Sequence, residues 1–171
     1  MILDPYKLFI CGSAEVPGFQ SKSITHMLRV ANPGSNFSRP PWLQGPYLQL
    51  SFGDVVSETD AKRCGTKAPS KEAILEGLTF FRTARKNSRS RILVSCDYGA
   101  SRSPALAYVF LADQLGPGQE VEAFRIIMQI SPNAVPNGLI VSLGDRELNR
   151  QGALLHPLRA LHSRINEELS R

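Results

Sequence analysis

The chain contains the stretch Ile92-Leu93-Val94-Ser95-Cys96-Asp97-Tyr98-Gly99-Ala100-Ser101-Arg102-Ser103-Pro104-Ala105. Its first residues form a short apolar run between polar residues, which is typical of a central parallel strand. A polar segment that contains a glycine, residues 96–103, comes next. Pro104 then lies where the first turn of a helix tolerates proline. The stretch therefore predicts a strand, a tight loop and a helix in direct succession.

The predicted loop combines the groups that a phosphate-binding site needs. A tight loop that enters a helix turns several backbone N–H groups toward one point, and the helix dipole adds positive potential there. The same field favours the thiolate of a cysteine at the centre, here Cys96. Arg102 offers a planar guanidinium for two phosphoryl oxygens, and the Ser103 hydroxyl can donate to the sulfur. We therefore expect a nucleophilic thiol beside a phosphate clamp.

Cys96 through Ser103 resembles the C-x5-R-[S/T] signature of the protein tyrosine phosphatase superfamily. The run Ser101-Arg102-Ser103-Pro104 is most similar to the dual-specificity subgroup and its compact bacterial relatives. The resemblance covers about residues 6–148, including the segment Pro132-Asn133-Ala134-Val135-Pro136-Asn137. It implies a phosphatase for phosphotyrosine, and for phosphoserine or phosphothreonine, that works through a phosphocysteine on Cys96 without a cofactor or metal.

The resemblance also implies roles for the residues of the loop. The residues expected to bind the phosphate through their backbone amides or side chain are Asp97, Tyr98, Gly99, Ala100, Ser101 and Arg102. The side chain of Asp97 is expected to point outward. One position departs from the family pattern, because Ser95 stands where the family usually has a histidine that helps to orient the loop. We expect this departure to affect the rate more than the type of reaction.

The leaving oxygen of a phosphate ester needs a proton, so a carboxylic acid on a separate loop is expected to face the site. In the family this acid lies some tens of residues upstream, on a loop that follows a strand. Asp54 fits best because it comes directly after the predicted strand at residues 47–52. Glu58 and Asp60 on the same loop are alternatives, and Asp54 could instead only cap a turn.

The remaining pattern predicts one α/β domain over residues 1–171. Strands are expected at residues 6–11, 24–30, 47–52 and 91–95. Helices are expected at residues 71–86 with Ser70 as N-cap, and at 104–115, 121–130, 139–148 and 154–169. Strands early and helices late predict a three-layer, tyrosine-phosphatase-like fold, in which helices flank a central, mostly parallel sheet.

Composition limits the other classes of protein. Hydrophobic residues make up 42% and charged residues 20% of the chain, which is ordinary for a soluble globular protein. No apolar run approaches the roughly 20 residues that span a bilayer, and residues 1–12 suggest a first strand rather than a signal peptide. The three cysteines and three histidines are not grouped, so we expect neither zinc nor disulfides, and a reducing, cytoplasmic location.

The net charge of +5 comes mostly from a basic run over residues 82–91. This run complements a helix dipole in a solvated loop, or it steers anionic substrates. The expected partner is a phosphorylated protein or a small phosphate ester, bound by a monomer that binds neither nucleic acid nor membrane. Two alternatives remain: a phosphate-binding module without catalysis, and an enzyme of the same fold for RNA, inositide or sugar phosphates. The lack of Lys or Arg within residues 97–101 weakens the second.

Overall fold

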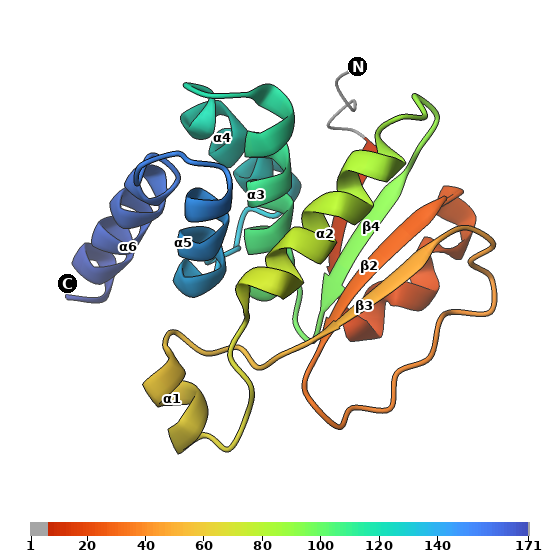
Figure 1. Ribbon diagram of the computed structural model, residues 1–171, viewed down its shortest axis with the longest axis horizontal. Helices are drawn as coiled ribbons and strands as arrows, with labels where there is room; N and C mark the ends of the chain where they lie inside the picture. Colours follow the sequence, from red (N-terminus) through yellow and green to blue (C-terminus); the bar gives the residue numbers. More distant parts are fainter. Residues whose placement is uncertain (1–6, 171) are drawn as a thin grey trace.

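The computed structural model describes residues 7–170, and its centre is a four-stranded parallel sheet (Figure 1). The strands are β1 (Leu8–Gly12), β2 (His26–Ala31), β3 (Tyr47–Ser51) and β4 (Ile92–Cys96). Their order in the sheet is β1-β4-β2-β3, and every neighbouring pair is parallel. All four predicted strands form with bounds within two residues of the prediction. Tyr6, at the start of the first predicted strand, lies outside the described residues.

Strand β4 is the most buried part of the sheet. It pairs with β1 and β2, so that Ile92 lies beside Leu8 on one side and His26 on the other. Ile92, Leu93 and Val94 are each 0% exposed. A strand covered on both faces buries consecutive side chains, which explains why its apolar residues run together instead of alternating.

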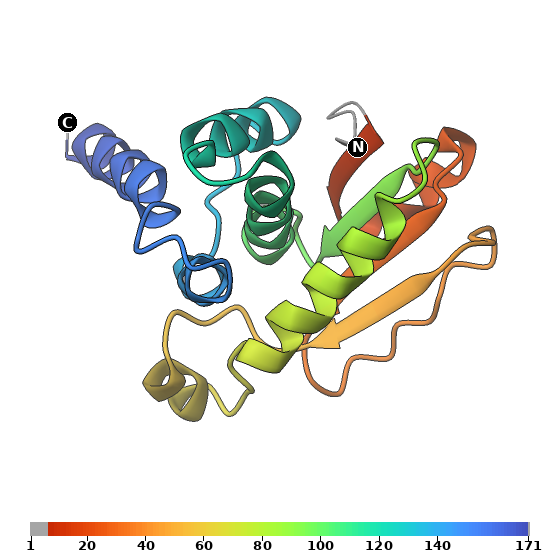
Figure 2. The ribbon, with the colours of Figure 1, turned by 45° about the horizontal axis from the view of Figure 1, so that its top comes forward.

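Helices form a thick layer on one face of the sheet. Helices α2 (Lys71–Ala84) and α3 (Arg102–Leu115) lie against the strands, and their Phe81 and Phe110 rings stack with centroids 4.2 Å apart. Beyond them come α4 (Glu120–Ile130), α5 (Gly138–Glu147) and α6 (Leu155–Leu169). Figure 2 shows α6 at the outer end of this layer. The predicted cap of α2 forms, since the Ser70 hydroxyl accepts from the Ala73 N–H at 3.3 Å.

The other face of the sheet is covered by the 3-10 helix η2 (Ser13–Lys22) and the loop at residues 32–46. Leu93, Met27 and Cys11 of the sheet form a second core there with Val16 and Leu43. The three-layer α/β class predicted from the sequence is therefore confirmed. Neither η2 nor the short α1 (Glu58–Arg63) was predicted, because segments this short or this irregular carry no clear hydrophobic period.

None of the helices in residues 7–170 has the length and apolar character that crossing a membrane requires.

Helices α3 and α5 approach closely at Gly144 of α5. A Cβ atom at this position would overlap the methyl groups of Val109 on α3, a side chain that is 1% exposed. Helix α3, which follows the loop after β4, is therefore held by a close contact that only glycine allows.

We expect Gly144→Ala to lower the free energy of unfolding in urea denaturation. Overpacking of a core costs about 1–3 kcal/mol, which exceeds the helix-propensity gain of at most about 1 kcal/mol. Gly138→Ala in the same helix is the matched control, because its Cβ would lie 3.8 Å from Leu158 in ordinary contact. Equal stability of both variants would contradict the close packing of α3 on α5.

Candidate active site

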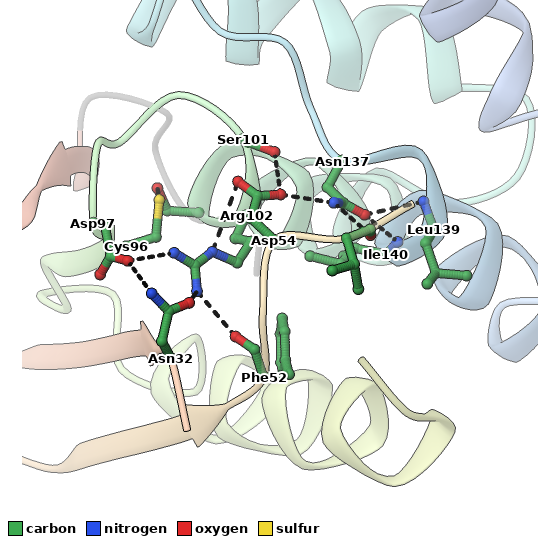
Figure 3. A network of polar contacts seen from close by, with 12 residues as sticks. Asn32, Phe52, Asp54, Cys96, Asp97, Ser101, Arg102, Asn137, Leu139 and Ile140 are labelled. Carbon is green, nitrogen blue, oxygen red and sulfur yellow. Dashed lines mark hydrogen bonds and ion pairs between the residues drawn. The ribbon is translucent and has the colours of Figure 1, made fainter. Parts of the chain in front are cut away.

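The candidate site lies at the carboxyl edge of the sheet. Because all four strands are parallel, their carboxyl ends meet there, which is where open α/β sheets bind ligands. Cys96 is the last residue of β4, Ser13 directly follows β1, and Asn32 directly follows β2. Asp54 lies three residues after the end of β3. Residues far apart in the sequence therefore come together around Cys96 (Figure 3).

The loop between β4 and α3, residues 97–101, packs tightly against the end of β1. Gly99 has a φ of 73°, and a Cβ atom there would lie 2.6 Å from the backbone of Cys11 and Gly12. Glycine is required at this position for both reasons. The loop then enters α3, where Pro104 is the third residue and loses no helical hydrogen bond, as the sequence predicted.

The carbonyl groups of the loop are held on its outer side. Three of them, and the carbonyl of Cys96 just before the loop, accept hydrogen bonds from residues outside it: Cys96 from Ser13 Oγ at 3.1 Å, Asp97 from Ser13 N at 3.0 Å, Ala100 from Val135 N at 2.8 Å, and Ser101 from Asn137 N at 3.2 Å. In a trans peptide the N–H points opposite to the C=O. The N–H groups that follow these carbonyls therefore point inward, as an anion cradle needs.

Arg102 presents an unused pair of donors to the site. Its side chain is 3% exposed, and Nη1 donates to Asn32 Oδ1 at 2.8 Å and to the Phe52 carbonyl at 2.9 Å. Nη2 donates to Asp97 Oδ2 at 2.8 Å. A guanidinium has five N–H groups, so Nε–H and one Nη2–H remain. Nε has no hydrogen-bond partner among residues 7–170, and this fork matches two oxygens of a phosphoryl group.

The side chain of Asp97 points toward Arg102, which corrects the expectation that it would point outward. Its Oδ2 accepts from Arg102 Nη2 and also from Asn32 Nδ2, both at 2.8 Å. Asn32 in turn accepts from Arg102, so the three side chains close a ring that fixes the plane of the guanidinium (Figure 3). The physical reason is that a buried cation needs a counter-charge.

The sulfur of Cys96 is buried and has one hydroxyl neighbour. Cys96 is 2% exposed, and Ser103 Oγ donates to its Sγ at 3.2 Å. The hydroxyl of Ser95 is buried and has no hydrogen-bond partner among the described residues. Burial, with the negative charge of Glu15 nearby, raises the pKa of Cys11 to about 12. Cys11 therefore stays a neutral thiol at neutral pH and is a poor alternative nucleophile.

A pocket of about 420 Å³ opens beside the loop. It is lined by Asn32, Gly53, Asp54, Val55, Cys64, Thr66, Asp97, Tyr98 and Arg102. Tyr98 is 89% exposed and forms part of the rim. Cys96 does not line this pocket, so a bound phosphoryl group would have to reach the floor between Arg102 and the loop to meet the sulfur.

The structure brings Asp54 to the site. Its Oδ1 accepts from Ser101 Oγ and from Asn137 Nδ2, both at 2.8 Å. Its Oδ2 lies 3.8 Å from Arg102 Nε, at the unused fork. Two hydrogen bonds occupy one carboxylate oxygen, so the other is the oxygen that can carry a proton toward a bound ester.

The two alternative acids lie elsewhere. Asp60 sits in α1, where its carboxylate binds Arg63 and accepts from the Val56 N–H at 3.3 Å. Glu58, the first residue of α1, is exposed. Neither residue lines the pocket that Asp54 and Arg102 share.

Two asparagines for which the sequence predicted no role organise the site. Asn32 holds both Arg102 and Asp97. Asn137 is 5% exposed; its Nδ2 donates to Asp54 and its Oδ1 caps α5 by accepting from the Leu139 N–H at 3.0 Å. The position of Asn32 two residues after the predicted strand at residues 24–30 was the available signal, since the carboxyl ends of parallel strands meet.

The basic run at residues 82–91 does not line this pocket. Arg82 and Arg85 contact the carboxylate of Asp113, and Arg91 donates to the Lys22 carbonyl at 2.6 Å. Arg91 precedes β4, so the run ends at the edge of the sheet opposite Cys96. Within residues 7–170 no group of three or more His, Cys, Asp and Glu side chains could hold a metal ion.

Comparison with known proteins identifies the fold. No protein-family model matches the sequence, and no curated protein sequence is similar to it. A human tyrosine phosphatase-like serine/threonine/tyrosine-interacting protein aligns with a TM-score of 0.63 and 19% identity, over 85% of this chain and 94% of that chain. A mouse putative dual specificity phosphatase, complexed with zinc tungstate, aligns with a TM-score of 0.64 and 19% identity over 86% of each chain.

Human DUSP28 aligns with a TM-score of 0.62 and 19% identity, over 86% of this chain and 93% of that chain. At such low identity the likeness concerns the arrangement of strands and helices. For this chain that arrangement is the four-stranded parallel sheet and the helices that pack on it. The chain therefore has the α/β fold of these tyrosine phosphatase-like and dual-specificity phosphatase structures.

Proposed function

We propose that this protein is a phosphatase that hydrolyses phosphate monoesters with Cys96 as its nucleophile. The observation that carries this proposal is the unused Nε/Nη2 fork of Arg102 in a pocket that Asp54 also lines. A guanidinium fork, inward N–H groups and the start of a helix together favour a tetrahedral dianion. The fold supports the same class of chemistry.

The mechanism follows from the positions of four side chains. Arg102 and the amides of residues 97–102 hold the phosphoryl oxygens while the Cys96 thiolate attacks phosphorus. Asp54 gives its proton to the leaving oxygen, which departs as an alcohol or phenol. Asp54 then takes a proton from the water that attacks the phosphocysteine. The sulfur leaves as a thiolate, stabilised by the hydrogen bond from Ser103, and inorganic phosphate is released.

The pocket favours a single phosphate on a protein or a small molecule. Among the residues that line it, Arg102 is the only arginine or lysine. A polyanionic inositide or an RNA would need further cations there. We therefore propose phosphotyrosine as the main substrate group, with phosphoserine and phosphothreonine as further ones. The three cysteines are free, which fits a reducing, cytoplasmic setting. We further propose a monomer of one domain.

A second candidate function is phosphate recognition without turnover. The burial of Cys96 favours it, because this residue is 2% exposed and does not line the pocket. The carboxylate of Asp97 also lies on the pocket wall, where it opposes a dianionic ester. The two functions differ in one measurable respect, which is hydrolysis that depends on Cys96.

We expect the parent chain to hydrolyse p-nitrophenyl phosphate and Cys96→Ser to lose this activity, because a hydroxyl is a far weaker nucleophile than a thiolate. The variant should still bind tungstate in calorimetry, since the loop and Arg102 are unchanged. Cys11→Ala removes the other buried thiol and serves as the control, which should keep its activity. A parent chain that binds tungstate without any turnover would establish the recognition module instead.

We expect Asp54→Asn to lower turnover on phosphotyrosine by about 10²–10⁴-fold, the usual contribution of a general acid. The loss should be smaller with p-nitrophenyl phosphate, whose leaving group needs less help from a proton. Tungstate affinity should stay near that of the parent. Asp60→Asn and Glu58→Gln are the matched controls, and a larger loss in either would reassign the acid.

A further inference from the structure

A second buried arginine lies beside the phosphate-binding loop. Arg29 on β2 is 4% exposed and pairs in register with Ser95, the residue before Cys96. The side chains of Arg102 and Arg150, which are 3% and 7% exposed, both have carboxylates within ion-pair distance. Within residues 7–170, Arg29 has no such partner, and its Nε makes no hydrogen bond there. The structure therefore buries a positive charge next to the loop without neutralising it.

The contacts of Arg29 lead directly to the loop. Its Nη2 donates to Ser13 Oγ at 2.6 Å, and its Cζ lies 3.5 Å from the centroid of the Phe37 ring. A hydroxyl carries one hydrogen, so the Ser13 hydroxyl can accept from Arg29 and donate to the Cys96 carbonyl at 3.1 Å. The Ser13 N–H donates to the Asp97 carbonyl at 3.0 Å. One residue thus holds both carbonyls at the start of the loop.

The hydrogen bonds from Arg29 to Ser13 and from Ser13 to the two carbonyls form a relay. This relay sets the direction of the amide N–H groups that a bound anion would contact. With the carbonyls of Cys96 and Asp97 bound on the outside, the N–H groups of Asp97 and Tyr98 point inward. Arg29 adds an electrostatic effect, because a guanidinium without a counter-ion attracts an anion strongly where water is excluded. Burying an unpaired charge is unfavourable, and a bound dianion offsets that cost. The neighbouring Ser95 supplies no charge of its own.

We propose that Arg29, acting through Ser13, is a positioning residue that presets the phosphate-binding loop for a tetrahedral dianion. This inference rests on the proposed function for its biological meaning, but it concerns anion binding rather than chemistry. The proposed role explains the hydrogen bonds from Arg29 through Ser13 and the buried charge of Arg29. Neither takes part in the mechanism proposed for the four catalytic side chains.

The test measures tungstate affinity by calorimetry on the full chain. Arg29→Met should weaken binding by about tenfold or more, as expected for loss of a nearby charge. Ser13→Ala should weaken it by about two- to tenfold, as expected for loss of one hydrogen bond. Arg29→Lys keeps the charge and should recover most of the affinity. Arg82→Met removes a charge from the surface pair with Asp113 and should bind like the parent.

Several outcomes would overturn the inference. If Arg29→Met and Ser13→Ala both bind tungstate like the parent, Arg29 has no role in the loop. Should Arg29→Met fail to fold, Ser13→Ala alone decides. If Arg29→Lys binds tungstate as weakly as Arg29→Met, the positive charge at position 29 does not contribute to anion binding. Hydrolysis of p-nitrophenyl phosphate by the parent chain separates the two proposals. If the parent chain binds tungstate without turnover, only the proposed phosphatase activity is excluded. If the parent chain binds no tungstate, both proposals are overturned.

Discussion

The parallel pairing of β4 between β1 and β2 is the constraint on which the rest of the structure depends. It places Cys96 at the carboxyl edge of the sheet with the ends of two further strands beside it. Ser13 and Asn32 enter the site only because they follow those strands. An antiparallel neighbour would bring its amino end to this edge, and the loop after β4 would lose the groups that hold its carbonyls and its arginine.

Hydrogen bonds at this edge of the sheet hold the guanidinium of Arg102 in place without using all of its N–H groups. Arg102 uses three of its five N–H groups on Asn32, Phe52 and Asp97, and the remaining fork faces the pocket. The carboxylate of Asp97 neutralises part of the cation that it holds. The contact that positions Arg102 therefore also weakens its attraction for an anion. A second buried arginine, Arg29, donates to Ser13 beside the loop and has no carboxylate partner within residues 7–170.

The part of the site around Asp54 includes a residue from a distant segment of the chain. Asp54 comes from the loop after β3, whereas Asn137 comes from the turn that starts α5, 83 residues later in the chain. Asn137 caps α5 with its oxygen and holds Asp54 with its nitrogen. Its backbone N–H also donates to the Ser101 carbonyl of the loop between β4 and α3. Helix α5 is therefore linked to both halves of the site through one side chain and its backbone.

The sequence by itself determined the strand, loop and helix around Cys96, because an apolar run, a glycine and a proline act through local backbone preferences. It also placed Asp54 after a predicted strand, which made Asp54 the first candidate for the general acid, ahead of Glu58 and Asp60. Only the tertiary structure decided the roles of Asn32, Asn137 and Arg29, and the inward turn of Asp97. These depend on which strand ends are neighbours and on which buried charges must be balanced, and neither leaves a local pattern in the chain.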